Sequence, residues 1–166
     1  MSLLIPTGYV HRVTDITAED LSALQIRALL VDIDNTLAVP DSQTPLPGTL
    51  AWGCALQDAG FRMILMSNNS EERVRPFARL YGLPFFPMSR KPLPGAFLCA
   101  ARQLGIDKRE SVVIGDQVYT DILGANLAGM KSVLTDPVLA EPSLSFRLRR
   151  RMERPVREKM RAGRAG

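Results

Sequence analysis

Two acidic residues, Asp32 and Asp34, lie two positions apart in the motif Asp-Ile-Asp-Asn-Thr that ends at Thr36. They follow the apolar run 28–31, which is typical of a buried strand. Because alternate residues of a strand face the same side, both carboxylates should point to one place beyond the strand's carboxyl end, where open α/β sheets bind ligands. Such a pair suits phosphoryl transfer, since one carboxylate can attack phosphorus while the other moves protons.

The pattern around this motif alternates between strands and helices. Gly, Pro and helix-capping residues separate the apolar segments, which are short enough to be single elements. We predict strands over residues 28–33, 62–66, 83–86, 111–114 and 131–134, and helices over 17–26, 50–59, 71–81, 95–104 and from about 121 to 128. This βαβα order predicts an α/β fold, a three-layer Rossmann-like parallel sheet with helices on both faces.

The composition indicates one domain. The chain has 166 residues, of which 46% are hydrophobic and 23% charged, as in ordinary globular proteins. No apolar stretch approaches the roughly 20 residues that span a bilayer, and the first five residues do not resemble a signal peptide, so we expect a cytoplasmic protein. We predict that Cys54 and Cys99 are reduced thiols in the core, because both lie in apolar helical patterns without a nearby metal-binding partner.

Further polar residues fall where the other strands of this sheet would end. Ser67 and Asn68 follow the second strand, Lys91 lies in a later loop, and Asp116 and Asp121 follow the fourth strand. In residue type, order and spacing these segments resemble the four motifs of the haloacid dehalogenase-like (HAD) phosphatases. The resemblance covers about residues 28–136, and it implies that all of these side chains converge with Asp32 and Asp34.

The resemblance also implies a role for each residue. Asp32 would be the nucleophile that forms an aspartyl-phosphate, and Asp34 would serve as general acid and base. Mg²⁺ would be held by Asp32, Asp116 and the backbone carbonyl of Asp34, since hard oxygen ligands suit that ion. The phosphoryl oxygens would be bound by Ser67, Lys91 and the backbone N–H of Asn68, while Asp121 would orient Lys91 or a metal-bound water.

The acid at position 34 favours a phosphatase over the ATPases and dehalogenases of the superfamily. The segments that follow Thr36 and Asn68 are too short for an inserted domain of the usual minimum of roughly 50 residues, so no cap domain is expected. The site should therefore be open, which suits a large or anchored substrate. From the N-terminal segment through Gly124-Ala-Asn126, the chain resembles the capless subfamily III branch that includes phosphatidylglycerophosphate phosphatases.

The C-terminal segment, residues 144–166, differs from the phosphatase domain, residues 1–143. Residues 147–166 carry nine Lys or Arg against two Glu. Apolar residues recur every fourth position at Leu148, Met152, Val156 and Met160, as in basic helices that lie on anionic membranes, although Pro155 interrupts the series. A solvated tail without a specific partner fits this composition equally well.

These observations favour a Mg²⁺-dependent phosphomonoester hydrolase that acts on phosphatidylglycerophosphate, or on another large anionic substrate, at the inner face of the membrane. A nucleic-acid end phosphatase, with the tail following the phosphate backbone, is the first alternative. A non-catalytic scaffold that docks on RNA or membrane through the tail is the second.

Overall fold

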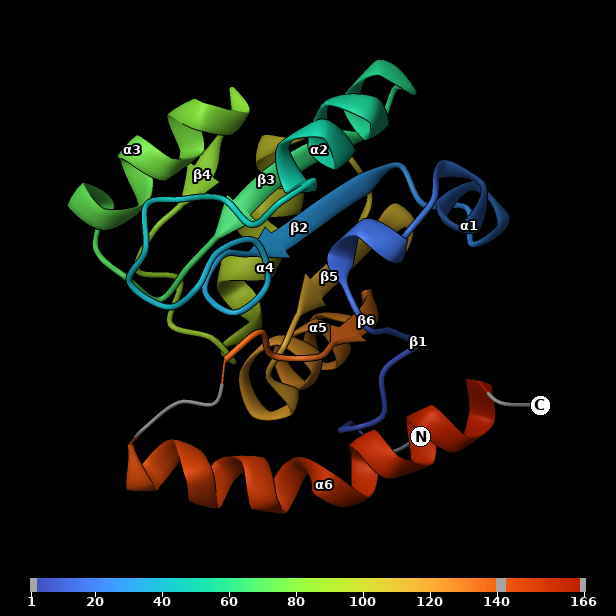
Figure 1. The fold of residues 1–166 in the computed structure, drawn as a ribbon. Helices are drawn as coiled ribbons and strands as arrows, with labels where there is room; N and C mark the ends of the chain where they lie inside the picture. The colour runs from blue at the N-terminus through green and yellow to red at the C-terminus, as the bar shows by residue number, and fades with distance from the viewer. Residues whose placement is uncertain (1–2, 140–142, 165–166) are drawn as a thin grey trace.

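The computed structural model describes residues 3–139 and 143–164 and shows a single sheet covered by helices (Figure 1). Its strands are β1 (Gly8–Val10), β2 (Ala28–Asp32), β3 (Arg62–Met66), β4 (Phe85–Phe86), β5 (Ser111–Gly115) and β6 (Lys131–Thr135). Its α-helices are α1 (Ala18–Ala23), α2 (Thr49–Asp58), α3 (Glu71–Tyr81), α4 (Pro94–Gln103), α5 (Leu123–Ala128) and α6 (Leu144–Arg164). Short 3-10 turns, η1 (Val13–Asp15) and η2 (Lys108–Glu110), precede α1 and β5, and a π-helical turn, η3 (Val118–Ile122), leads into α5.

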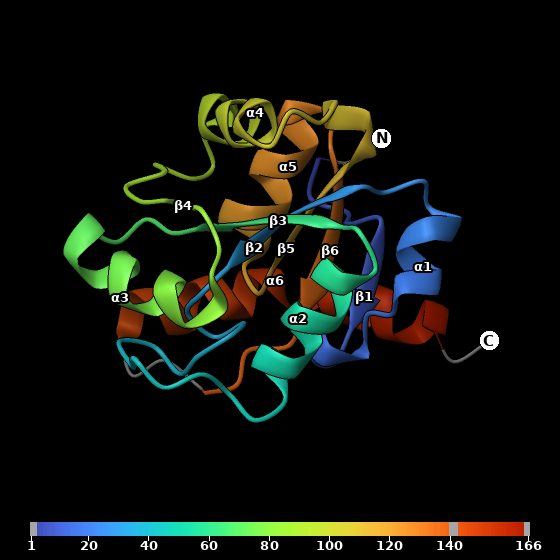
Figure 2. The same cartoon turned by 90° about the horizontal axis from the view of Figure 1, so that it is seen from above.

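All six strands are parallel, in the order β1-β6-β5-β2-β3-β4. Seen from above, α2 and α3 lie on one face of the sheet and α4 and α5 on the other (Figure 2). Within the described residues, the segments that leave β2 and β3 contain no inserted domain. The predicted three-layer α/β fold without a cap is therefore confirmed. The edge strand β1, which pairs with β6, was not predicted.

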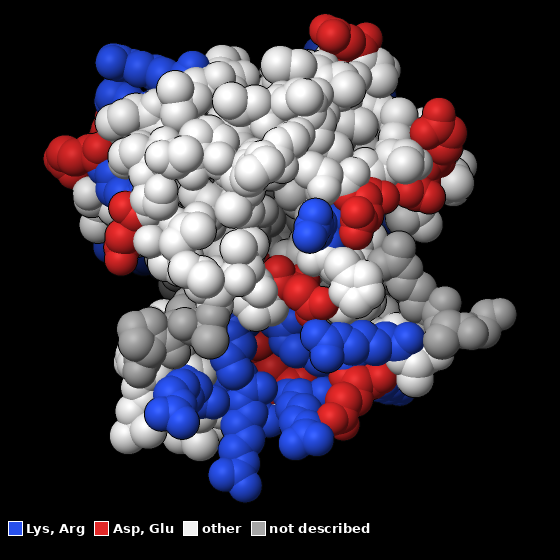
Figure 3. Space-filling view, viewed as in Figure 1, with Lys and Arg blue, Asp and Glu red and all other residues white. Residues whose placement is uncertain are grey.

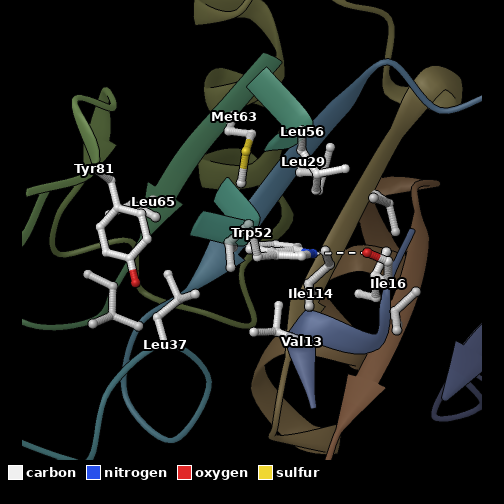
Figure 4. Close-up of a cluster of buried hydrophobic side chains, with 14 of the residues drawn as sticks. Val13, Ile16, Leu29, Leu37, Trp52, Leu56, Met63, Leu65, Tyr81 and Ile114 are labelled. Atoms are coloured by element: carbon white, nitrogen blue, oxygen red, sulfur yellow. Dashed lines mark hydrogen bonds between the residues drawn. The ribbon is translucent and has the colours of Figure 1, made fainter. Parts of the chain in front are cut away.

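The larger core cluster lies between the sheet and the helices α2 and α3. Its centre is Trp52 of α2, which packs among strand residues such as Leu29 and Leu65 (Figure 4). The indole Nε1 donates a hydrogen bond of 2.9 Å to the backbone oxygen of Ile16, just before α1. The polar atom of this large side chain is therefore satisfied inside the core, as buried indoles require. The bond also ties the N-terminal segment to the face that carries α2.

On the opposite face, α4 and α5 approach each other closely. Phe97 of α4 is fully buried against the sheet residues Leu30 and Ile64. A Cβ atom added to Gly124 of α5 would overlap the Phe97 ring. The small residue at position 124 is therefore what allows the two helices to pack above the central strands.

The predicted burial of the two cysteines is wrong. Cys54 and Cys99 are free thiols, as expected, but both are exposed. On α2 the buried face is formed by Trp52, Gly53 and Leu56, and on α4 it includes Phe97. Each cysteine lies two residues from a buried aromatic residue, which is about 200° around a helix and places it on the solvent side.

The basic segment forms the long helix α6, which lies along the side of the body near β1 (Figure 1). Glu153 anchors it and is completely buried. Its Oε1 accepts a 2.9 Å hydrogen bond from the backbone N–H of Val118 in η3, and its Oε2 accepts bonds from Arg150 at 3.0 Å and Arg157 at 3.1 Å. Arg157 also donates to the backbone oxygen of Thr135, at the end of β6, at 3.1 Å. A charged cluster therefore holds α6 across the ends of β5 and β6.

The second half of α6 is held by a further group of contacts. Arg161 donates to Asp136 at 2.8 Å and to the hydroxyl of Tyr9 at 3.0 Å, and the Tyr9 hydroxyl donates to Asp136 at 2.5 Å. Burial acts to raise the pKa of Asp136, but the hydrogen bonds from Tyr9, Arg161 and His11 outweigh it and hold the pKa below its usual value. This carboxylate therefore joins α6 to β1 and to the segment after β6.

The apolar residues of α6 divide into two groups. Val156 and Met160 pack against the small cluster of Tyr9, Val118, Ile122 and Leu134. Leu144, Leu148 and Met152 are exposed, with relative accessibilities of 79%, 59% and 55%. None of the helices in the described part of the chain is both long and apolar enough to cross a bilayer.

Gly124→Ala is expected to destabilise the protein. The added methyl group must displace the Phe97 ring, and overpacking of this kind costs about 1–3 kcal/mol. Urea unfolding followed by circular dichroism would measure the loss. Gly95→Ala is the matched control, because a Cβ at that position of α4 meets nothing within 4 Å; equal stability of the two variants would contradict the packing argument.

Glu153→Ala is expected to release α6 from the body. The change removes the nearer carboxylate partner of the buried Arg157 and leaves only the longer contact with Asp136, at 3.5 Å. Breaking a buried pair costs up to about 3–5 kcal/mol. The loss should appear as faster trypsin cleavage within the helix, detected by mass spectrometry. Glu158→Ala, which removes an exposed partner of Arg154, should leave the cleavage rate unchanged. Equal protection in Glu153→Ala would show that this cluster does not hold α6.

Candidate active site

The loops after β2, β3 and β5 meet at one end of the sheet and line a cavity of about 390 Å³ that is open to solvent. The predicted residues Asp32, Asp34, Ser67, Asn68 and Lys91 all line it. The remaining wall comes from the β2–α2 and β3–α3 loops, from η3 with the residue before it, and from α6 with the residue before it: Pro40, Asp41, Asn69, Gln117, Thr120, Ser143, Phe146 and Arg149. Five of the predicted side chains therefore lie at one cavity, and α6 supplies a wall that was not predicted.

Lys91 is the buried cation of the site. Its Nζ forms an ion pair with Asp32 and a second one, of 2.6 Å, with Asp121. Burial alone would lower the pKa of Lys91, but the carboxylates of Asp121 and Asp32 outweigh it and hold the pKa above its usual value. Lys91 therefore stays protonated, and Asp121 lies where it can hold the ammonium group in place.

Asp32 is buried beside two further carboxylates. Burial raises the pKa of Asp32 well above its usual value; the charge of Lys91 opposes this shift, while Asp121 and Asp116 add to it. Another cation at this point would favour the ionised form of Asp32, which is the form that can act as a nucleophile. The electrostatics of the site thus match a nucleophile that works with a bound cation.

The carboxylates of Asp32, Asp116 and Asp121 can supply ligands to a metal ion. One oxygen atom of each lies within 4.8 Å of the others, and all three residues are buried. An all-oxygen ligand set fits a hard divalent cation better than Zn²⁺, which favours Cys and His. The guanidinium of Arg150 contacts the Asp116 carboxylate directly, so a metal ion and Arg150 would share this ligand.

The side chain of Asp34 points to a different set of partners. Its Oδ2 accepts a 2.7 Å hydrogen bond from Asn69, and its Oδ1 accepts bonds from Arg73 at 3.1 Å and from the backbone N–H of Asp41 at 3.2 Å. The carboxylate is therefore fixed at the cavity wall, outside the group of Asp32, Asp116 and Asp121. This separation suits proton transfer better than metal binding by the side chain.

Asn68 connects the loop after β3 to the loop that carries Lys91. Its Oδ1 accepts hydrogen bonds from the backbone N–H of Lys91 at 2.8 Å and from the Ser89 hydroxyl at 3.1 Å. The Ser89 hydroxyl lies 2.8 Å from the backbone oxygen of Ser67, and the Ser67 hydroxyl accepts from the Asn69 N–H at 3.1 Å. The Asn68 side chain therefore positions Lys91. From the sequence, a role was predicted only for the backbone N–H of Asn68 and not for this side chain.

Several residues of the site were missed from the sequence. Asn69 and Arg73 contact Asp34, although both look like ordinary residues at the start of a helix. Arg150 contacts Asp116 from a segment that composition alone treats as a tail. The sequence does contain one indication that this segment is a helix held by ion pairs. Glu153 is an acid within a basic segment, at helical spacing from Arg150 and Arg157, and such an acid can offset the repulsion between the positive charges of a helix.

Comparisons with known proteins point to the same family as the motifs. A family model described as HAD-hydrolase-like matches residues 88–137. The protein named "Probable phosphatase YqeG" from Bacillus subtilis (strain 168) is 34% identical over 152 residues, which is 92% of this chain and 88% of that protein. Pyrophosphatase PpaX from Bacillus pumilus (strain SAFR-032) is 35% identical over 86 residues, 46% of this chain and 39% of that protein.

Among solved structures, NagD from E. coli K-12 superposes with a TM-score of 0.57 at 14% identity, over 72% of this chain and 90% of that one. This likeness concerns the fold, whereas the match to the Bacillus subtilis phosphatase extends over most of both sequences. The match to the Bacillus subtilis phosphatase and the family model together favour an enzyme over a non-catalytic scaffold. The chain belongs to the HAD-like phosphatase superfamily and is a phosphoric monoester hydrolase.

Proposed function

We propose that this enzyme is a Mg²⁺-dependent phosphatase that forms an aspartyl-phosphate on Asp32 and acts on phosphatidylglycerophosphate or a related membrane-anchored phosphomonoester. The observation that carries the proposal is the buried cluster in which Lys91 pairs with both Asp32 and Asp121 beside the Asp116 carboxylate. A phosphomonoester dianion repels a carboxylate nucleophile, and positive charge at this position offsets the repulsion.

In the first half of the reaction, a carboxylate oxygen of Asp32 attacks the phosphorus. The bond between phosphorus and the ester oxygen breaks, and the leaving alcohol takes a proton from Asp34. Lys91 and Ser67 line the same cavity and would hold the phosphoryl oxygens during this transfer. The contacts from Asn69 and Arg73 hold Asp34 at the cavity wall, from which it would reach the leaving oxygen.

In the second half, water attacks the phosphorus of the aspartyl-phosphate. Asp34, which lost its proton to the alcohol, now accepts one from this water. The bond to Asp32 breaks, phosphate leaves, and the carboxylate of Asp32 is restored. One acid therefore serves both steps, which explains why the motif needs a second carboxylate two residues after the nucleophile.

We assign Mg²⁺ to the oxygen ligands of Asp32, Asp116 and the backbone carbonyl of Asp34. Bound there, the ion would neutralise charge on the phosphoryl group and favour the ionised form of Asp32. The contact between Arg150 and Asp116 places a side-chain cation at the same carboxylate, so Arg150 and the ion would both offset its charge.

Two features support a membrane-anchored substrate. The catalytic cavity is open, with no inserted domain in the described part of the chain to enclose a small metabolite. The exposed residues Leu144, Leu148 and Met152 follow one another at four-residue spacing along α6, the helix that also forms a cavity wall. An apolar stripe on a basic helix can bind an anionic bilayer surface. We therefore assign the chain to the capless branch that resembles phosphatidylglycerophosphate phosphatases, working at the inner membrane face.

A nucleic-acid substrate is less well supported. Four arginines of α6 form ion pairs with acids of the protein itself: Arg150 and Arg157 with Glu153, Arg154 with Glu158, and Arg161 with Asp136. Their charge is already balanced, which leaves less of it for a phosphate backbone than the sequence suggests.

Asp32→Asn is expected to reduce turnover of p-nitrophenyl phosphate in Mg²⁺ by at least about a thousandfold, because an amide oxygen is a poor nucleophile. Released product is measured by absorbance, and circular dichroism checks the fold. Asp58→Asn, on the exposed end of α2, is the matched control and should behave as wild type. Full activity in Asp32→Asn would exclude the covalent mechanism.

Leu148→Ser is expected to reduce phosphate release from phosphatidylglycerophosphate in mixed micelles by roughly tenfold, since burying a leucine side chain is worth about 1.5–3 kcal/mol. Turnover of soluble p-nitrophenyl phosphate should stay the same. Leu127→Ser changes another exposed leucine, 47% accessible and away from α6, and should affect neither substrate. If wild type releases phosphate from a 3′-phosphorylated oligonucleotide but not from the lipid, the membrane assignment is wrong.

A further inference from the structure

We propose that Arg149 of α6 forms an anion-binding subsite at the wall of the catalytic cavity and selects phosphomonoesters that carry a second negatively charged group. The inference rests on the proposed phosphatase function and deepens it by naming a class of substrate. The second group would be a phosphodiester, phosphate or carboxylate on the same molecule as the phosphate that is removed.

The position of Arg149 is fixed by its neighbours. It lines the same cavity as Asp32 and Lys91. Its Nη1 donates a 2.9 Å hydrogen bond to the side-chain oxygen of Gln117, and its guanidinium carbon lies 5.1 Å from the centre of the Phe146 ring. Stacking on an aromatic ring and one hydrogen bond hold the plane of the guanidinium while leaving other N–H donors for a ligand.

The charge of Arg149 is not balanced in the way that its neighbours' charges are. Arg150 and Arg157 pair with the buried acid Glu153. For Arg149, the Gln117 oxygen is the one acceptor that its N–H groups reach among residues 3–139 and 143–164. Arg149 is half-buried and has no carboxylate partner among those described residues. Such a guanidinium attracts anions, and its paired donors match a carboxylate or phosphate.

Arg149 is also not needed to hold α6 in place. The helix is fixed by the buried contacts of Glu153 with Val118 and by Arg157 with the end of β6. Residues 149, 153 and 157 share one side of the helix, so these anchors direct Arg149 toward the cavity. In the space-filling view, Lys and Arg side chains gather over α6, and acidic side chains lie between them and the body (Figure 3).

The cavity contains two cationic side chains, Lys91 and Arg149, to which the proposal gives different roles. Lys91 is buried between Asp32 and Asp121 and faces the reacting phosphate, whereas Arg149 belongs to the wall formed by α6. A substrate whose one anionic group is the phosphate bound at Lys91 would have no second group for Arg149. A substrate with a second anion can also bind Arg149, and a charge-assisted bidentate contact is worth roughly 10- to 100-fold in affinity.

The test compares kcat/KM for glycerol 3-phosphate, which has one anionic group, with that for 3-phosphoglycerate and glycerophosphoglycerol phosphate, which have two. Wild type should prefer the substrates with two anionic groups. Arg149→Gln should reduce this preference by roughly 10- to 100-fold, mainly through KM, and Arg149→Lys should retain part of it. Arg151→Gln, at an exposed arginine of α6 that does not line the cavity, should keep the preference.

A binding measurement separates this inference from the proposed function. In the Asp32→Asn background, calorimetry should show that Arg149→Gln weakens glycerophosphoglycerol phosphate more than glycerol 3-phosphate. That result would support the subsite even if wild type turned over neither ester. An equal loss for both ligands, a faster trypsin cleavage of α6, or no change in selectivity would overturn the subsite while leaving the aspartyl-phosphate mechanism untouched.

Discussion

The structure depends on how charge is balanced where the central strands end. Three buried carboxylates, those of Asp32, Asp116 and Asp121, lie together beyond β2 and β5. Like charges at this separation in a dry environment repel strongly, and each costs several kcal/mol unless a cation is near. Lys91 is therefore placed between two of them. The Asn68 contact to the Lys91 backbone serves this balance as much as it serves catalysis, because it fixes the loop that carries the cation.

The same requirement explains why a strongly basic segment folds onto the body. Asp116 is balanced by Arg150, and Glu153 draws Arg150 and Arg157 together over η3. A helix with so many positive charges would repel itself in isolation. Packing against the acidic end of the sheet makes the helical form of this segment favourable. The segment therefore completes the charge balance of the domain, although its composition alone resembles that of a detached tail.

The fold was largely predictable, because buried parallel strands give short apolar runs and the helices between them carry clear caps and stops. Predictions failed where tertiary contacts decide. Gly8–Val10 forms a strand only because β6 offers it an edge. Cys54 lies in an apolar stretch, yet the helix turns it to solvent. The motif residues converge because parallel strands end at one edge. Arg73, in contrast, contacts Asp34 only through packing that no local pattern encodes, and for Arg150 the sequence offers only the spacing of Glu153.

In the proposed function, the position of α6 would give an open phosphatase site a means of selecting its substrate. Many enzymes enclose their substrates with an inserted domain, but here the loops after β2 and β3 are short and a wall comes from the end of the chain. On α6, Leu144 and Leu148 face outward, while Arg149 lies at the cavity. In the proposed function this opposition matters, since a bilayer that receives the leucines would present anionic headgroups to the arginine side. Surface binding and substrate selection would then follow from two faces of one helix, which the contacts of Glu153, Arg157 and Arg161 hold against the body.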